Sequence, residues 1–253
     1  MPGIHSGKVA IVTGASANMG KLFATALAKD GADVMVHYNS DSKRKAAEQV
    51  ADELRDEGVR AETLQADLTR PTEITRLVDT TLEKLGRWDI LVNTSGMIVR
   101  KPIADCTEAE WDALFAINAK IPFFQMREAA GKMADNGRII NMITTQVAVT
   151  AATYAAYAGS KSPVEHYTKA FAQEIGPRGI TVNCVAPGPQ KTDFFYNAET
   201  DKTIEWLKGM TINGDLGEPT DVVPVIQFLA SPGARWVTAQ TVYVNGGMIS
   251  PAS

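Results

Sequence analysis

The sequence predicts an α/β fold, in which a doubly wound parallel sheet of seven strands carries helices on both faces. Short apolar runs recur along the chain, and segments with helical periodicity separate them. The length of 253 residues and the hydrophobic content of 45% suffice for one sizeable core. Since no linker, low-complexity stretch or repeat interrupts the pattern, we expect a single domain over residues 1–253.

The predicted strands are short, mostly apolar runs. Helices cover both faces of a parallel sheet, so its strands favour continuous apolar sequence over strict alternation. We therefore expect each strand to be buried on both faces. The seven runs lie at 8–13, 33–38, 61–65, 89–93, 138–143, 180–186 and 241–244.

The predicted helices lie between these runs. Pro71 opens one of them at a position where a helix tolerates proline. Pro122 lies inside another helical segment, which we expect it to kink or divide in two. The segments with helical periodicity are 41–57, 71–86, 107–133, 153–176 and 219–230.

Composition excludes several classes of function. A net charge of −4 argues against non-specific binding to nucleic acid or anionic membranes. Cys106 and Cys184 are far apart, so neither a disulfide framework nor a zinc site is indicated. The histidines show no metal-ligand spacing, and we expect no metal site. Without a signal peptide or an apolar stretch of roughly 20 residues, the protein is expected to be cytoplasmic.

The stretch TGASANMG, residues 13–20, follows the first predicted strand. A glycine-rich turn between a strand and a helix lets backbone N–H groups face a phosphate. Gly14 allows a tight turn, and Gly20 allows close packing of helix on strand. Asn18 tolerates a left-handed backbone better than most residues do. An ordinary strand-to-helix loop remains the alternative, because short glycine motifs are weak signals.

Residues 157–161, YAGSK, place Tyr157 and Lys161 four positions apart on one face of a helix. A nearby ammonium lowers the pKa of a phenol and makes it useful for proton transfer. Tyr154 lies about 10 Å from Lys161 along the helix axis, which makes Tyr157 the better candidate. A helix also places such a pair four apart by chance, with one side chain packed and the other solvated.

Together these motifs resemble the short-chain dehydrogenase/reductase family, in its common branch of about 250 residues. The resemblance covers nearly the whole chain. Within the family, the sequence is similar to 3-oxoacyl-carrier-protein reductases and carbonyl reductases. It implies a Rossmann fold, an NAD(P) cofactor and the transfer of a hydride between nicotinamide and a carbonyl or alcohol. The matching elements, in order, are TGASANMG (13–20), Asp67-Leu68, NTSG (93–96), Asn118, Thr144, YAGSK (157–161), PGPQKT (187–192) and VNGG (244–247).

The resemblance assigns the catalytic roles. Tyr157 is the expected general acid in carbonyl reduction, and Lys161 is expected to lower the pKa of Tyr157 and to bind the nicotinamide ribose. Thr144 stands where the family has a serine that binds the substrate oxygen. If the register of the strand differs by one residue, Thr145 takes this role instead. Asn118 is expected to hold a water next to Lys161, or else to bond to helix backbone.

The resemblance also implies a set of cofactor-binding residues. Asn18 replaces the second glycine of the family, and NTSG replaces the usual NNAG. Gln190 stands at a usually aliphatic position close to the expected nicotinamide carboxamide. These departures bear on cofactor affinity and leave the reaction class unchanged. The expected cofactor-binding residues are Gly14, Ser16, Asn18, Met19, Gly20, Tyr38, Asn39, Ser40, Asp67, Leu68, Asn93, Ser95, Gly96, Tyr157, Lys161, Pro187, Gly188 and Thr192.

The end of the second strand favours NADP(H) over NAD(H). NAD-dependent members commonly carry an acidic residue there, which accepts a hydrogen bond from the ribose 2′-OH. Tyr38 occupies this position, so no carboxylate repels a 2′-phosphate. Asn39 and Ser40 supply donors, and Lys43 or Arg44 supplies positive charge or is simply solvated. NAD(H) remains a possible cofactor, because Asp41 lies nearby and the glycine turn has no basic residue.

Residues 189–216 are expected to form a flap over the substrate. Its aromatic content favours a medium-sized hydrophobic ketone, although the same side chains also suit packing of the flap onto its own domain. The apolar residues are Phe194, Phe195, Tyr196, Trp206 and Met210.

Alternative functions remain open at this point. Reduction of a 3-oxoacyl thioester ranks lower because Asp135 stands where such enzymes carry basic residues, although Arg178 could meet an acidic carrier. Oxidation of a sugar or polyol and a non-catalytic dinucleotide-binding role rank lower still. The resemblance further implies a homo-oligomer, a dimer or homotetramer, formed through the helices of 107–133 and 153–176.

Overall fold

The computed structural model describes residues 3–149 and 151–248; the two ends of the predicted domain and Thr150 lie outside the described residues. Seven strands form one sheet in the order β3-β2-β1-β4-β5-β6-β7, and every neighbouring pair is parallel. The fold class predicted from the sequence is therefore confirmed. The strands are β1 Val9–Val12, β2 Asp33–Tyr38, β3 Ala61–Gln65, β4 Ile90–Asn93, β5 Arg138–Met142, β6 Thr181–Pro187 and β7 Thr241–Val244.

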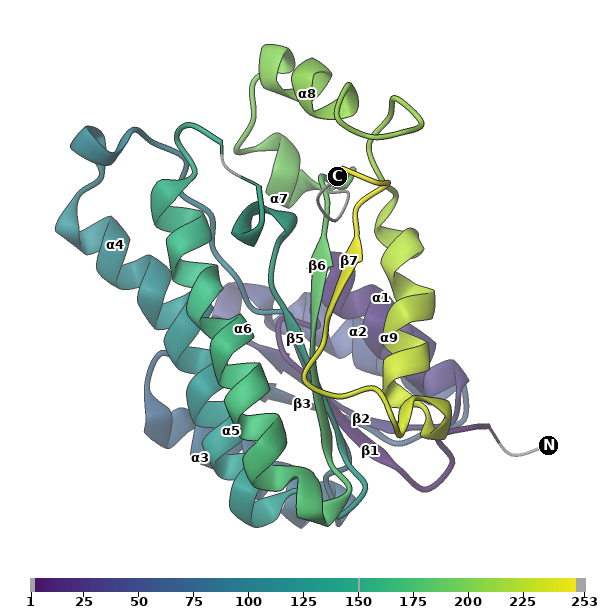
Figure 1. The fold of residues 1–253 in the computed structure, drawn as a ribbon. Coiled ribbons are helices and arrows are strands. Elements are labelled where there is room, and N and C mark those ends of the chain that lie inside the picture. Colours follow the sequence, from purple (N-terminus) through teal and green to yellow (C-terminus); the bar gives the residue numbers. More distant parts are fainter. Residues whose placement is uncertain (1–2, 150, 249–253) are drawn as a thin grey trace.

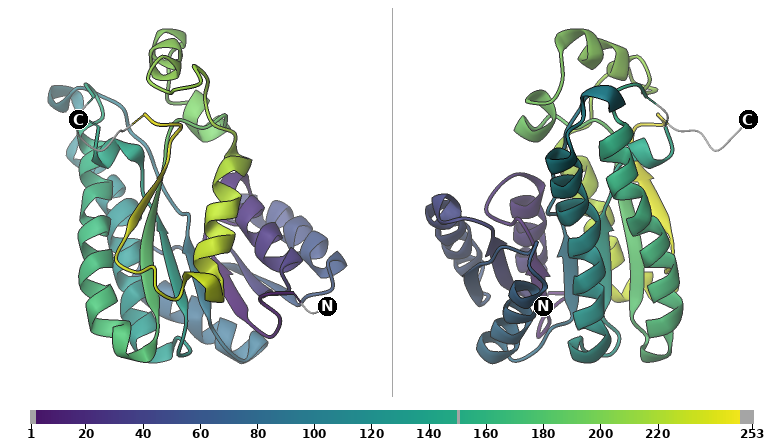
Figure 2. Two further views of the ribbon diagram at one scale, coloured as in Figure 1. Left: turned by 45° about the vertical axis from the view of Figure 1, so that its right-hand side comes forward. Right: turned by 90° about the vertical axis from the view of Figure 1, so that its left-hand side faces the viewer.

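The helices form a layer on each face of the sheet (Figures 1 and 2). The first layer packs one apolar cluster against alternate strand residues, and the second layer packs another. The first layer consists of α1 Asn18–Lys29, α2 Arg44–Asp56 and α9 Val223–Ala230. The second layer consists of α3 Pro71–Leu85, α4 Glu108–Phe115, α5 Ile121–Lys132 and α6 Ala155–Ile175.

Burial differs between the centre and the edges of the sheet. All residues of β1, β4 and β5 are buried, as continuous apolar runs predict. The edge strands β3 and β7 are only partly covered, so the expectation of burial on both faces is wrong for these two. An edge strand has a neighbour on one side alone, and the helix layers do not extend over it fully.

The segment 107–133 holds two α-helices joined by a π-helical turn, Ala116–Lys120. Pro122 has no N–H, so it cannot donate to the carbonyl of Asn118 as an α-helix requires. The expected interruption thus occurs one turn before the proline. π-helical turns of this kind are frequent at functional sites, and this one carries Asn118.

The segment 189–216 lies beyond the carboxyl ends of the strands, where α7 Asp193–Tyr196 and α8 Asp201–Lys208 project from the body (Figure 1). Phe195 and Met210 pack onto a small apolar cluster there, whereas Phe194, Tyr196 and Trp206 are exposed. Within the described part of the chain, no helix has both the length and the apolar character needed to cross a bilayer.

Candidate active site

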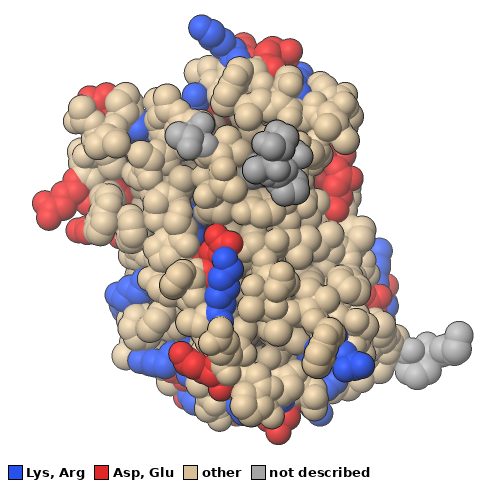
Figure 3. Space-filling view, viewed as in Figure 1, with Lys and Arg blue, Asp and Glu red and all other residues tan. Residues whose placement is uncertain are grey.

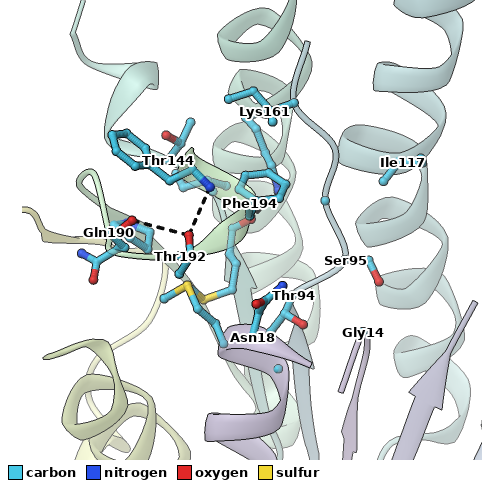
Figure 4. A pocket seen from close by; sticks show the side chains of 18 of the residues that line it. Gly14, Asn18, Thr94, Ser95, Ile117, Thr144, Lys161, Gln190, Thr192 and Phe194 are labelled. Atoms are coloured by element: carbon cyan, nitrogen blue, oxygen red, sulfur yellow. Dashed lines mark hydrogen bonds between the residues drawn. The ribbon is translucent and has the colours of Figure 1, made fainter. Parts of the chain in front are cut away.

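A cleft with a volume of about 500 Å³ runs across the carboxyl ends of the central strands and under the flap (Figure 4). This is the edge at which open α/β sheets bind ligands. Figure 4 shows Thr144 and Lys161 on the body side, facing Gln190, Thr192 and Phe194 of the flap. The predicted site residues that line the cleft are Gly14, Ser16, Asn18, Met19, Gly20, Tyr38, Asn39, Ser40, Asp67, Leu68, Ser95, Gly96, Thr144, Tyr157, Lys161, Pro187, Gly188 and Thr192.

The glycine turn has the geometry of a phosphate-binding turn. Gly14 and Asn18 adopt left-handed backbone, with φ of 62° and 50°. A side chain on Gly20 would bring its Cβ within 2.4 Å of the Gly14 carbonyl oxygen, so α1 approaches the turn too closely for any other residue. The helix N-terminus and the turn therefore present backbone N–H groups to the cleft. This cradle fits the pyrophosphate of a dinucleotide.

His37 joins two walls of the cleft, and the sequence analysis did not find this role. Its Nδ1 accepts a hydrogen bond of 3.1 Å from the Gly14 N–H, so Nε2 carries the proton and donates to the Ala66 carbonyl at 2.9 Å. Burial lowers the pKa of His37 to about 4. The imidazole is therefore neutral and fixes the glycine turn against the segment that leads to Asp67. Its position at the end of β2 was the one available signal.

Tyr157 and Lys161 both lie buried in the cleft wall. Burial raises the pKa of Tyr157 to about 12, and the nearby Thr144 hydroxyl lowers it in part. Burial lowers the pKa of Lys161 to about 8, and the Lys161 ammonium donates to the Met142 carbonyl at 2.9 Å. In this structure the pKa of Tyr157 thus lies above its ordinary value, which differs from the lowering expected from Lys161.

Thr144, rather than Thr145, faces Tyr157. Thr144 lines the cleft just after β5, and its hydroxyl lowers the pKa of Tyr157. Thr145 is buried and donates to the Ala186 carbonyl at 3.2 Å, so its hydroxyl serves the protein interior.

Two predicted residues lie behind the cleft. Asn118 is fully buried; its side chain accepts from the Met97 N–H at 3.0 Å and donates to the Met97 carbonyl at 2.8 Å and to Ser160 at 2.9 Å. It therefore fixes the segment after β4 against the start of α6. Asn93 donates to Asn141 at 2.7 Å across the two central strands.

The end of the cleft beside β2 has one cation without an ion pair among the described residues. Arg44 pairs with Asp41 at 2.8 Å, and both side chains are exposed. Lys43 lines the cleft beside Tyr38, Asn39 and Ser40. No ion pair to Lys43 occurs within residues 3–149 and 151–248. The positive charge at the end of β2 is thus available to a ligand.

The cleft contains two unsatisfied acceptors, one on the segment after β5 and one on the flap. The side-chain carbonyl oxygens of Gln146 and Gln190 are buried and lack a hydrogen-bond partner within the part of the chain that the structure describes. Both residues line the cleft. Thr192 accepts from the Phe195 N–H at 3.2 Å and so caps α7 (Figure 4). Buried acceptors of this kind call for donors from a ligand or from water.

A second polar cluster escaped the sequence analysis. The Tyr154 hydroxyl donates to Glu199 of the flap, and Arg100 pairs with the same carboxylate. Burial, and then the bond to Glu199, raise the pKa of Tyr154 far above its ordinary value. These residues are 45 and 99 positions from Glu199 in sequence. Residues so far apart in sequence form no local motif that could indicate the cluster.

The molecular surface carries no strong local charge on the face shown in Figure 3, where basic and acidic side chains are interspersed around uncharged residues. Among the residues that the structure describes, no group of three or more histidine, cysteine, aspartate or glutamate side chains is placed to hold a metal ion.

Comparison with known proteins agrees with this geometry. The family model described as enoyl-(acyl carrier protein) reductase matches residues 14–249. A short-chain type dehydrogenase/reductase of Picea abies is 40% identical, with 96% of this chain and 93% of its own length covered. The hydroxynaphthalene reductase-like protein Arp2 of Metarhizium majus is 38% identical, with 97% and 96% covered.

Similarity extends to solved structures. A Burkholderia cenocepacia protein crystallised with bound NADP is 39% identical, with a TM-score of 0.94 and with 98% of this chain and 95% of that chain covered. The match spans the glycine turn, the cleft and the flap alike. With its fold, its Tyr-x-x-x-Lys helix and its relatives in agreement, the chain belongs to the short-chain dehydrogenase/reductase family and is an NAD(P)-dependent oxidoreductase.

Proposed function

We propose that this protein reduces a medium-sized hydrophobic ketone with NADPH, as a single catalytic domain. The observation that carries the proposal is the convergence of Tyr157, Thr144 and Lys161 in one cleft with a phosphate-binding glycine turn. When bound, the reduced nicotinamide supplies the hydride for the carbonyl carbon. The chain supplies the proton and the binding surface.

Tyr157 donates the proton to the carbonyl oxygen. A phenol with a pKa of about 12 is protonated at neutral pH, so Tyr157 carries the proton that it donates. The Thr144 hydroxyl holds the same oxygen and stabilises the negative charge that develops on it. Lys161, whose ammonium is held in the cleft wall, favours the phenolate that proton donation leaves.

NADP(H) is the favoured cofactor, and NAD(H) remains the alternative. Lys43, together with donors on Asn39 and Ser40, suits a 2′-phosphate at the end of β2. The bound NADP of the similar Burkholderia cenocepacia protein supports this assignment. Gln190, whose buried side-chain carbonyl oxygen has no partner among the described residues, would accept from the nicotinamide carboxamide.

The lining of the substrate end favours an apolar ketone. Phe194, Phe195, Leu207 and Met248 all border the cleft, and apolar walls with few polar groups are typical of small-molecule sites. The reductase name of the Metarhizium majus relative is consistent with this class. The cytoplasmic location and the homo-oligomer stay predictions from the sequence.

A 3-oxoacyl thioester on an acidic carrier is the second candidate. Arg178, which the sequence offered as the carrier's partner, pairs with Asp135 at 2.7 Å and donates to the Ala130 carbonyl at 2.9 Å at the end of α5. Its guanidinium is therefore engaged by the protein itself. Because the Arg178 guanidinium is already bonded within the protein, we rank the carrier-bound thioester below a free ketone as the substrate.

Replacing Tyr157 tests the proposed chemistry. Tyr157→Phe should lower kcat by about 10²–10⁴-fold, the usual contribution of a general acid, without weakening NADPH binding. Tyr154→Phe is the matched control and should keep most of kcat, because its hydroxyl is bound to Glu199. Turnover is followed by NADPH absorbance, and binding by NADPH fluorescence. Full activity in both variants would exclude the assignment.

A substrate panel tests the proposed class. NADPH and NADH are offered separately with simple ketones, β-keto esters, a 3-oxoacyl thioester and a 2-enoyl thioester; the last is included because of the description of the matching family. Turnover of ketones with NADPH is expected. Turnover of a thioester alone would replace the proposal with a fatty-acyl reductase, and tight cofactor binding without turnover would favour an alcohol or sugar substrate or a binding protein.

A further inference from the structure

The flap carries one buried carboxylate in the wall of the cleft. Glu199 lies between α7 and α8, and its side chain is only 1% exposed. Transfer of a carboxylate from water into a protein interior is costly unless charge and hydrogen bonds compensate it. Such a group on a segment beyond the main core therefore demands specific partners.

Both carboxylate oxygens of Glu199 have a partner on the body of the protein. Oε1 accepts from the Tyr154 hydroxyl, immediately before α6, and Oε2 accepts from Arg100, which follows β4. Tyr154 itself is 4% exposed. One flap side chain is thus bonded to the two segments that form the opposite wall of the cleft.

Arg100 is held in a fixed orientation. Its Nε donates to Thr153 at 2.9 Å, its second terminal nitrogen donates to Thr203 of α8 at 3.0 Å, and its guanidinium lies 5.1 Å from the centre of the Tyr154 ring. Thr153 has a φ of 72°, which is strained for a β-branched residue and persists only when its surroundings fix it. The cluster is therefore organised around the carboxylate.

The other side of the flap is anchored differently. The Ile212 N–H donates to the Gly246 carbonyl at 2.9 Å, and Leu207 packs with Leu216 and Met248. Apolar packing and backbone bonding hold this side, whereas an ion pair holds the side nearest α6. When a buried ion pair separates, both charges regain their hydration. The net free-energy cost of separation is therefore small compared with the direct attraction between the two charges. The α6 side is consequently suited to opening and the β7 side to acting as a hinge.

We propose that Glu199 is a positioning residue that latches the flap over the substrate, with Arg100 and Tyr154 as its receptors. The closed flap brings Phe194 and Phe195 to the apolar wall and excludes water from the carbonyl. The latch therefore controls the affinity for the ketone, whereas the glycine turn and the end of β2, which bind the phosphates of NADPH, lie on the body. This inference rests on the proposed function for its kinetic effect and on the structure alone for its effect on the flap.

Glu199→Gln tests the latch, because it removes the charge and preserves the shape. Glu205→Gln is the matched control on α8, since the Glu205 side chain is 73% exposed and, in the part of the chain that the structure describes, pairs only with Lys208 of the same helix. Hydrogen exchange of the flap amides is measured in the full-length protein without cofactor. Exchange should become about tenfold faster in Glu199→Gln, within the range for coupled side-chain pairs, and remain unchanged in Glu205→Gln. Unaltered exchange in Glu199→Gln would overturn the latch.

Kinetics supply the second readout. In Glu199→Gln the KM for the ketone should rise about tenfold, while the Kd of NADPH stays constant. If the wild-type protein reduces no ketone, the proposed function fails, but the exchange comparison still decides the latch. Should Glu199→Gln not fold, Tyr154→Phe replaces it, with the exposed Tyr196→Phe as control. A KM and an exchange rate unchanged in Tyr154→Phe would then overturn the inference.

Discussion

At the scale of single residues, His37 shows how one neutral imidazole can shape a cofactor site. Its two nitrogens have different roles: Nδ1 accepts from the Gly14 N–H, and Nε2 donates to the Ala66 carbonyl. Protonation would place a second donor against the Gly14 N–H and break that bond. The buried environment, which lowers the pKa of His37 to about 4, keeps the acceptor intact at neutral pH.

Two substitutions separate these roles. His37→Asn places an amide oxygen near the position of Nδ1 and can still accept from Gly14, whereas His37→Gln reaches Ala66 and leaves the Gly14 N–H unpaired. We expect NADPH to bind His37→Asn nearly as tightly as wild type and His37→Gln about tenfold more weakly, because an orphaned buried N–H costs ~1–3 kcal/mol. Fluorescence titration with NADPH measures both. The opposite order of affinities would show that the Ala66 bond is the important one.

The contrast between found and missed residues has a physical origin. Tyr157 and Lys161 lie four positions apart on one helix, so a local pattern indicates them. Glu199 and His37 gain their roles from partners tens of positions away, and such contacts exist only once the chain has folded. The roles assigned to Thr144 and Asn118 came from the family resemblance, and the structure adds that Asn118 uses its side chain to brace Met97 and Ser160.

At the scale of elements, the glycine turn depends on the close approach of α1 to β1. Gly20→Ala would force the new Cβ against the Gly14 carbonyl oxygen, 2.4 Å away, and displace the helix N-terminus. We expect the variant to lose about 1–3 kcal/mol of stability, as overpacked sites do, and to bind NADPH more weakly. Urea unfolding and fluorescence titration measure these effects.

Gly131→Ala supplies the matched control for that prediction. It lies in α5, and nothing lies within 4 Å of its added Cβ. The same substitution should there stabilise the protein by about 0.5–1 kcal/mol, because alanine has the higher helix propensity. Equal effects of the two substitutions would mean that helix propensity, not the approach of α1, decides the outcome.

The elements themselves were largely predictable because their signals are local. Apolar runs located the ends of all seven strands to within one residue, and Pro71 marked the start of α3. The π-helical turn was not predictable in this form: Pro122 indicates an interruption, but where the extra residue is accommodated depends on Asn118 and its contacts with other segments. The half-covered edges β3 and β7 likewise follow from strand order, which no single run reveals.

At the scale of the whole molecule, a buried carboxylate joins the central strands β1 and β4, in addition to apolar packing. Asp89, before β4, accepts from Lys8 and from the Val9 N–H, both at 3.0 Å, and also from Arg87. Burial alone would raise the pKa of Asp89, but these hydrogen bonds bring it below its ordinary value. Its contribution to stability is thus present at neutral pH and is lost as the pH falls through that lowered value.

His37 makes stability depend on pH in a higher range than Asp89 does. Its folded-state pKa of about 4 lies below the ordinary value of 6.5, so the unfolded chain binds more protons between these values. Stability should therefore fall as the pH drops from 6.5 to 4, by ~3 kcal/mol from this residue. Urea unfolding of wild type at intervals from pH 7 to 4 measures the slope.

His37→Asn carries no titrating group at this position and should have a shallower slope over the same interval. Some dependence will remain, because burial also lowers the pKa of His5, and Asp89 begins to titrate at the acidic end. The difference between the two curves, rather than either curve, isolates the imidazole that links the glycine turn to the segment before Asp67. Parallel curves would mean that His37 is hydrated or charged in solution, and the proposed support of the cofactor turn by a neutral histidine would then be wrong.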